Sequence, residues 1–391
     1  MKNLAGKLVV MLVGLAGGLL LLEAILRLAG FGTYETVPDP TIGYRYIPHA
    51  HYRWITEGGS TGRFNSEGWR DVEHPKAKPA HTTRILLLGD SFVAAFQVPL
   101  DSTFHRRLES ALNQRARTGQ RFEVIALGQN GNGTTTEYLT YKRWGVRYDP
   151  DLVAVLFVLN DPADDWRPSA LQQEHPFFVE QGDSLGLDTS FRDTAAFLKG
   201  ERLLWLKSRS VLWAQLRGAL ATLRARFSPP RQPTGATWDG YIPAWNFDAR
   251  LPADSIPAFR LTEKILARFA REVASDHRRF IVFASGFAPQ EDRALLATFG
   301  RDPFFDPEKT RRWLTAVGAR HGFDVVPLSP AFRAASRELG APLWFGKSPL
   351  YGHWNSAGHA VAASVMERYL ARTLAGLDTT GLGVELGGRS P

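Results

Sequence analysis

RILLLGDSF, residues 84–92, is a continuous apolar run that stops at Gly89 and is followed at once by Asp90 and Ser91. Apolar residues without polar alternation are typical of a strand that is buried on both faces of a parallel sheet. Two later runs, residues 122–127 and 152–159, have the same character. The stretch therefore predicts the first strand of a parallel sheet, with Ser91 at its carboxyl end.

Helical spacing of apolar residues alternates with these strands. We expect helices at residues 103–113, 135–145, 261–275, 307–321 and 359–374, and further strands at 280–284 and 324–328. Strands that alternate with helices specify a parallel sheet with helices on both faces. The prediction is one three-layer α/β/α domain.

The N-terminal segment predicts a membrane anchor. Residues 8–22 read LVVMLVGLAGGLLLL, and apolar residues continue to Leu28, which is long enough for a helix that crosses a bilayer. No convincing small-residue cleavage site follows, so we expect residues 1–30 to be a retained signal anchor. Because Lys2 and Lys7 flank the short N-terminal side, we expect a single-pass protein of the inner (cytoplasmic) membrane, with the remaining chain on the periplasmic side.

The rest of the chain divides into four predicted parts: an irregular lead-in at 31–80, the main domain at 81–376, an insertion into it at about 165–257, and a frayed tail at 377–391. Within the insertion, residues 201–227 form an amphipathic helical pattern with leucine and tryptophan against arginine and lysine. We expect its apolar face to pack on its own domain, and contact with anionic lipid is the alternative.

Composition excludes several classes of function. The formal net charge is +8, but basic and acidic residues are interspersed, so we expect no nucleic acid partner. The chain has no cysteine, which excludes thiolate catalysis, disulfides and a lipidated N-terminal cysteine. The histidines lack metal spacing, and Gly128, Gly131 and Gly133 lack dinucleotide-loop spacing, so no metal and no cofactor are expected.

Polar and glycine residues at the strand ends suggest a catalytic site. Ser91 follows the first strand, Gly131 lies in the turn after the second, and Asn160 ends the third. A hydroxyl nucleophile needs a base, and it needs donors for the oxyanion that forms on its substrate. The backbone N–H groups of Ser91 and Gly131 with the Asn160 amide would form such an oxyanion hole. His353, in the loop before the last helix, would be the base.

In this order the four residues resemble the conserved blocks of the SGNH hydrolases, also called the GDSL family. The resemblance is closest to a bacterial membrane-anchored branch, through a lead-in like residues 65–71 and an ending like Gly352-His353-Trp354-Asn355. It implies a flavodoxin-like fold with Ser91 and His353 as catalytic residues. It also implies an extracytoplasmic esterase or O-acyltransferase that acts on acyl esters, mainly acetyl esters, of a cell-surface or exported glycan. A transferase would need a multi-span protein as acyl donor.

One departure from the family concerns the aspartate that precedes its catalytic histidine by two or three positions. Leu350 and Tyr351 occupy those positions here. Three explanations remain open: another carboxylate serves, with Asp161, Asp164 and Asp165 as candidates; a Ser-His dyad works with a backbone carbonyl as the orienting group; or the site is degenerate. The last explanation favours a different function, a membrane-tethered polysaccharide-binding or assembly factor with weak or no catalysis.

Overall fold

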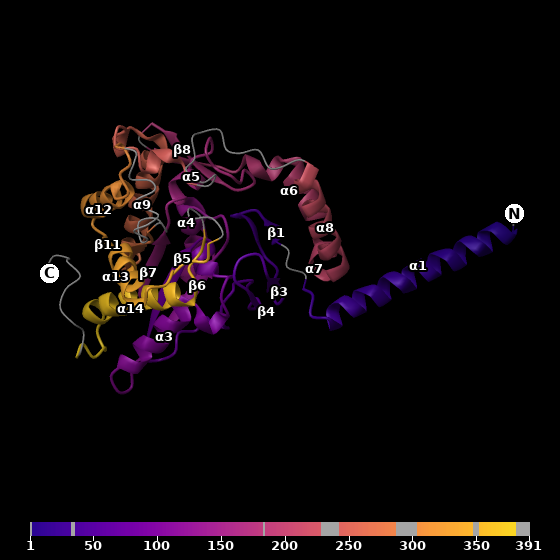
Figure 1. Ribbon diagram of the computed structural model, residues 1–391, viewed down its shortest axis with the longest axis horizontal. Coiled ribbons are helices and arrows are strands. Elements are labelled where there is room, and N and C mark those ends of the chain that lie inside the picture. Colours follow the sequence, from indigo (N-terminus) through magenta and orange to yellow (C-terminus); the bar gives the residue numbers. More distant parts are fainter. Residues whose placement is uncertain are drawn as a thin grey trace.

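The computed structural model describes residues 2–32, 36–182, 184–227, 242–286, 303–346 and 352–380. Its centre is a five-stranded sheet (Figure 1), which consists of β5 (Thr82–Gly89), β6 (Arg121–Gly128), β7 (Leu152–Phe157), β10 (Arg279–Ala284) and β11 (Asp324–Pro327). All neighbouring strands are parallel, in the order β11-β10-β7-β5-β6. The predicted parallel α/β sheet is confirmed, and all five expected strands are present.

The strand order places a switch point between β5 and β7. From β5 the chain moves outward to β6 on one side, and it then returns to β7 and builds outward through β10 and β11 on the other. This is the flavodoxin-like order, in which ligands bind at the carboxyl ends of the strands that flank the switch point. Ser91 directly follows β5 and Asn160 follows β7, so the topology brings both to the same edge of the sheet.

Helices cover both faces of the sheet. On one face lie α3 (Phe104–Arg115), α13 (Ser329–Leu339) and α14 (Ser356–Thr373), and on the other lie α4 (Thr134–Arg143), α9 (Pro257–Ser275) and α12 (Lys309–His321). In β5, Leu86 and Leu88 join one apolar cluster whereas Ile85 and Leu87 join the other. Successive side chains of a strand point to opposite faces, so a strand with an apolar layer on each face has no polar alternation.

The N-terminal helix α1 (Lys2–Leu28) extends away from the rest of the chain (Figure 1). Its segment Gly6–Leu28 is long and apolar enough to cross a membrane and has none of its residues buried. The helix therefore has the properties of a signal anchor or membrane span. The type of membrane and the orientation remain predictions.

The lead-in forms two small hairpins, β1 (Thr36–Asp39) with β2 (Gly43–Tyr46) and β3 (His51–Trp54) with β4 (Ser60–Arg63). Arg70, which is buried, fixes the second hairpin to the segment that follows β5. Its Nε donates to the Tyr52 hydroxyl at 2.6 Å, and its Nη1 donates to the carbonyls of Ala94 and Ala95 at 2.9 and 2.8 Å. The loop between β3 and β4 is thereby held beside the turn that carries Ser91.

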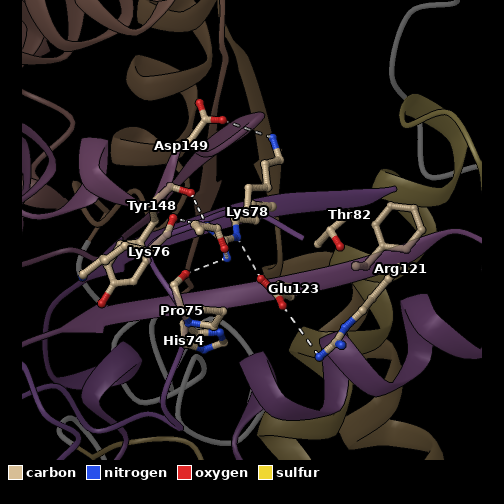
Figure 2. A network of polar contacts seen from close by, with 12 residues as sticks. His74, Pro75, Lys76, Lys78, Thr82, Arg121, Glu123, Tyr148 and Asp149 are labelled. Carbon is tan, nitrogen blue, oxygen red and sulfur yellow. Dashed lines mark hydrogen bonds and ion pairs between the residues drawn. The ribbon is translucent and has the colours of Figure 1, made fainter. Parts of the chain in front are cut away.

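A second buried arginine, Arg84, joins the end of the lead-in to the amino-terminal edge of the sheet. Its Nε donates to Glu123 on β6 at 2.8 Å, and its Nη groups donate to the carbonyls of Tyr148 and Pro75, both at 2.7 Å. These three partners are labelled in Figure 2. The arginine side chain is fully buried and that of Glu123 is nearly so. The ion pair therefore has little access to water.

The insertion contains the hairpin β8 (Phe177–Gln181) with β9 (Ser184–Asp188) and three helices, α6 (Ala195–Arg202), α7 (Leu204–Arg209) and α8 (Val211–Phe227). The single helix expected at 201–227 is thus interrupted at Leu203 and Ser210. The expectation that its apolar face packs on its own domain is wrong for α8 beyond its first turn: Val211 is buried and Trp213 is partly buried, but Leu216, Leu220 and Leu223 are exposed. Short 3-10 turns lie at Leu100–Ser102, Gly145–Tyr148, Ser190–Asp193, Ala244–Asn246 and Ala253–Ser255. Residues 228–241 of the insertion and 381–391 of the tail lie outside the described ranges.

Replacement of Arg84 with methionine should lower the free energy of unfolding by about 3–5 kcal/mol, because the buried Glu123 would keep only the exposed Arg121, 3.6 Å away, as a cationic partner. The double variant Arg84→Met with Glu123→Leu should recover part of this loss, because it removes the uncompensated charge. Chemical unfolding followed by tryptophan fluorescence measures both. A single variant as stable as the wild type would show that the pair does not hold the lead-in.

Candidate active site

Ser91 begins the short helix α2 (Ser91–Ala94) at the carboxyl end of β5. Asp90 caps this helix, because its carboxylate accepts a hydrogen bond from the Phe92 N–H at 2.9 Å. Val93 and Ala94 of this helix are buried, while the partly exposed Ser91 lines a cavity of about 850 Å³.

His353 lies next to Ser91. Its Nε2 is 2.8 Å from the Ser91 Oγ, although the two residues are 262 positions apart in the chain. The Phe92 ring packs beside the imidazole, with 4.9 Å between the ring centroids. A hydroxyl that donates to an imidazole nitrogen at this distance is in the geometry of a nucleophile with its general base.

The second ring nitrogen of His353 contacts Glu57, in the loop between β3 and β4. Nδ1 donates to Oε2 at 2.6 Å, and the backbone N–H of His353 donates to Oε1 of the same carboxylate at 2.8 Å. Burial acts to raise the pKa of Glu57, but the hydrogen bonds and charge of His353 outweigh it, so this pKa lies below its ordinary value. Glu57 is therefore ionised at neutral pH, and it holds the imidazole in the tautomer that leaves Nε2 free to accept the serine proton.

Two glycines allow the loop that carries Glu57 and the loop that carries His353 to approach each other this closely. Gly58 has a φ of +62°, and a Cβ there would lie 2.2 Å from the Gln97 carbonyl oxygen. A Cβ on Gly352 would lie 1.7 Å from the Phe345 carbonyl oxygen and 3.1 Å from Oε1 of Glu57. Side chains at these positions would separate Glu57 from His353.

The carboxylate that contacts His353 comes from elsewhere in the chain, as the first of the three explanations allows, but the three aspartates named as candidates for it are wrong. Asp161 accepts from the Val158 N–H, Asp164 from the Asn160 amide, and Asp165 from the Thr135 N–H. The explanation by a Ser-His dyad is wrong as well, because the ring has a carboxylate partner. Leu350 and Tyr351 lie outside the described residues.

Sequence reasoning missed Glu57 because the residue precedes His353 by 296 positions. A search for the acid near the histidine, or after the third strand, does not reach it. The surrounding residues, Thr56 and the Gly58-Gly59 pair, predict only a turn, in which any polar side chain is acceptable. No local pattern in the lead-in distinguishes Glu57 from its other carboxylates.

Gly131 and Asn160, the other expected members of the oxyanion hole, line the same cavity as Ser91 and His353. Gly131 has a φ of +68°, and a Cβ there would lie 2.1 Å from the amide nitrogen of Gln172. Asn160 precedes α5 (Asp161–Asp165), and its Nδ2 donates to Asp164 at 2.8 Å and, more weakly, to Asp90 at 3.4 Å. The structure brings all four expected residues to one cavity, and their roles remain a prediction.

A group of buried carboxyl side chains lies beyond Asn160, namely Asp90, Glu137, Asp161, Asp164 and Asp165. Burial raises the pKa of each, to about 8 for Asp164 and about 6 for Asp165. At neutral pH the oxygen that holds the Asn160 amide therefore belongs largely to an uncharged acid. A neutral neighbour suits a site where an oxyanion forms, because a second negative charge there would oppose it.

Other polar and aromatic residues near the C-terminus have structural roles. Nδ1 of His359 accepts from the Phe104 N–H at 3.2 Å, and burial holds the pKa of this histidine well below its usual range. Asn355 caps α14 by accepting from the N–H groups of Ala357 and Gly358. Trp354 is fully buried. Among the residues that the structure describes, no group of three or more His, Asp or Glu side chains is arranged to hold a metal ion.

Asp164→Asn should make the protein more stable at alkaline pH. The pKa of Asp164 in the folded protein, about 8, exceeds its ordinary value of 3.8, so the folded state retains a proton that the unfolded chain has released. Stability therefore falls as pH rises from about 4 to about 8, by at most about 1.4 kcal/mol per pH unit. The amide cannot ionise but still accepts from Asn160. The unfolding midpoint of Asp164→Asn relative to that of the wild type should rise between pH 5 and 8. A difference between the two midpoints that stays constant with pH would contradict the account.

The match with known families begins within β5 and ends within α14. Residues 87–361 match the model of the GDSL-like lipase/acylhydrolase family. No curated protein matches the sequence. The matched range contains Ser91, Gly131, Asn160 and His353, whereas Glu57 precedes it.

The solved structures that match this chain have low sequence identity to it. TesA is 12% identical, with 75% of this chain and 100% of that chain covered and a TM-score of 0.40. The acetyl xylan esterase AlAXEase is also 12% identical, with 72% and 97% covered and a TM-score of 0.39. A catalytic mutant of an acetylxylan esterase from Geobacillus stearothermophilus is 12% identical, with 73% and 93% covered and a TM-score of 0.38.

Proposed function

The chain belongs to the GDSL-like lipase/acylhydrolase family, and from that premise we propose that it is a serine acyl hydrolase or acyltransferase with Ser91 as nucleophile. His353 is the general base, and Glu57 is the acid that positions it. The observation that carries the proposal is the pair of hydrogen bonds on the two nitrogens of one imidazole, 2.8 Å to Ser91 and 2.6 Å to Glu57. This arrangement is the geometry of a serine triad.

The reaction follows from these contacts. The Ser91 oxygen attacks the carbonyl carbon of an ester while its proton passes to Nε2 of His353. The negative charge that develops on the carbonyl oxygen is stabilised by the N–H groups of Ser91 and Gly131 and by the Asn160 amide. When the intermediate collapses, the leaving alcohol takes the proton from His353, and an acyl-serine remains. Glu57 stabilises the imidazolium during both transfers.

Asn160 is positioned for this role by its two contacts. Its strong hydrogen bond to Asp164 fixes the amide plane, whereas the contact with Asp90 at 3.4 Å is long. An oxyanion on the substrate can therefore replace Asp90 as the acceptor of the second N–H of this amide at little cost in free energy. The neutral state of Asp164 avoids a full negative charge beside that oxyanion.

The acceptor in the second half of the reaction determines whether the protein is a hydrolase or an acyltransferase. Water that attacks the acyl-serine gives a hydrolase, and a sugar hydroxyl gives an O-acyltransferase, with His353 as the base in both cases. The aromatic rings of Trp54 and Trp344 and the amides of Gln97, Asn130 and Gln172 line the cleft. Its volume, about 850 Å³, exceeds what an acetyl group alone requires, and its amides suit hydroxyl groups. These features support an acylated glycan as substrate, and α1 supports a reaction at a membrane.

The alternative of a non-catalytic polysaccharide-binding protein depended on the missing aspartate. Glu57 supplies a carboxylate to Nδ1 of His353, so the missing aspartate is no longer a reason for this alternative. We therefore favour the enzyme.

Ser91→Ala should abolish covalent labelling by a fluorophosphonate probe, because the hydroxyl that lies against Nε2 of His353 is lost. His353→Ala should reduce labelling and the hydrolysis of p-nitrophenyl acetate at least about 10³-fold, because the base is lost. In-gel fluorescence and absorbance measure these effects. A wild type that neither reacts with the probe nor hydrolyses the ester would support the binding protein instead.

Glu57→Gln should lower kcat by about 10³ to 10⁴ and leave KM nearly unchanged, since Glu57 acts through His353 and not on the substrate. Glu57→Asp should recover part of the loss if the loop can adjust. Glu180→Gln, an exposed glutamate of β8, is the matched control and should behave as wild type. If Glu57→Gln keeps normal turnover, the positioning role is wrong; if all rates fall with the unfolding midpoint, the effect is structural.

A further inference from the structure

The membrane-anchor helix α1 and the insertion helix α8 are joined through one side chain. The Glu23 carboxylate accepts hydrogen bonds from the backbone N–H groups of Val211 and Leu212, both at 2.9 Å, and from the Ser210 hydroxyl at 3.0 Å. These bonds satisfy N–H groups at the start of α8 that have no partner within the helix. Glu23 therefore acts as a cap supplied by another helix.

A second contact strengthens the same junction. Arg27, one turn further along α1, forms an ion pair with Glu23 at 2.7 Å. It also donates to the carbonyl of Arg209, the last residue of α7. The turn between α7 and α8 is thus fixed to the last two turns of α1. Figure 1 shows α7 and α8 beside the end of α1, between that helix and the sheet domain.

The junction sets the depth of α8 if α1 crosses a bilayer. A carboxylate and a guanidinium are costly in hydrocarbon, so the pair of Glu23 and Arg27 would lie at the level of the headgroups. The apolar residues 8–22 would then occupy the bilayer core. Because the N-terminus of α8 is bonded to Glu23, that end of α8 lies at the headgroup level too.

The side chains of α7 and α8 suit that position. Six large apolar residues, which we call the α7–α8 face, are exposed: Leu204 (41%), Trp205 (66%), Leu216 (50%), Leu220 (45%), Leu223 (51%) and Phe227 (80%). The four on α8 follow one another at steps of four, three and four residues, so they form one stripe. Arg217 and Arg224, which are also exposed, each follow a leucine of the stripe and lie along its flank.

We propose that the α7–α8 face lies on the surface of an anionic bilayer, next to the point where α1 enters it. An apolar stripe with a basic flank and an interfacial tryptophan is the pattern of helices that lie in the plane of a membrane. The arginines pair with acidic headgroups while the leucines enter the boundary of the acyl chains. The inference depends on α1 as a span and is independent of the reaction at Ser91.

The absence of cysteine makes a direct test possible in the full chain. Single-cysteine variants Leu220→Cys, Leu339→Cys and Leu15→Cys carry an environment-sensitive fluorophore in vesicles of phosphatidylcholine with a quarter phosphatidylglycerol. Nitroxide-labelled lipids are the quenchers. Leu339, an exposed leucine of α13, is the matched control, and Leu15 reports insertion of α1.

We expect lipid-borne nitroxide to quench the label at position 220 at least about threefold more than the label at 339, and to quench the label at 15 as well. Equal quenching at 220 and 339, with 15 quenched, would overturn the proposal. A label at 220 that is shielded from aqueous iodide but not quenched by lipid would also overturn it, because another protein surface would then cover the face. An unquenched label at 15 would remove the premise that α1 inserts.

A charge-reversal arm tests the choice of anionic lipid. In Leu220→Cys, the changes Arg217→Glu and Arg224→Glu should at least halve the quenching, and vesicles of phosphatidylcholine alone should do the same to the parent. Arg117→Glu with Arg143→Glu, two exposed arginines elsewhere, should have no effect. Quenching that is indifferent to all these changes contradicts the anionic surface. Unfolding midpoints of the variants confirm that each chain is folded.

Discussion

The hydrogen bond from Nδ1 of His353 to Glu57, together with the contact of Nε2 with Ser91, joins three distant parts of the chain in one site. Ser91 comes from the end of the first sheet strand, His353 from the loop before the last helix, and Glu57 from a hairpin that precedes the sheet altogether. For this contact to form, the hairpin must be fixed to the sheet domain, which the buried Arg70 does by binding the carbonyls that follow α2. Gly58 and Gly352 then give the loops room to meet. The lead-in is therefore part of the site and not an appendage to it.

The two acids that matter most in the cleft have opposite electrostatic environments. Glu57 gains hydrogen bonds from His353 that keep it charged, whereas Asp164 is buried among other carboxyls and has a pKa of about 8. The charged acid faces the imidazole, which would become positive during the proposed reaction. The largely neutral one faces the amide that would bind the oxyanion. The two environments therefore place negative charge beside the imidazole and keep it away from the Asn160 amide.

Much of the fold could be predicted because its strands and helices produce local patterns of apolar and polar residues in the sequence. The apolar run that includes Leu86 and Leu88 identifies a strand buried on both faces, and the polar residues after each strand identify the edge where Ser91 and Asn160 meet. Glu57 could not be found this way, because its partnership with His353 is a contact between loops with no periodic signal. Whether Leu220 would be buried or exposed could not be decided from the sequence either, because an amphipathic stripe has the same pattern whether it packs on protein or on lipid.

The most direct test of the central claim is the protonation state of the His353 ring, observed by NMR in a protein with ¹⁵N-labelled histidine. With ten histidines in the chain, a His353→Gln variant assigns the signals. When the ring is neutral, the account predicts a proton fixed on Nδ1, strongly deshielded by the short bond to Glu57, with Nε2 unprotonated. It also predicts that Glu57→Gln removes the deshielded signal. A ring that averages both tautomers in the wild type, or is unaffected by Glu57→Gln, would contradict the account.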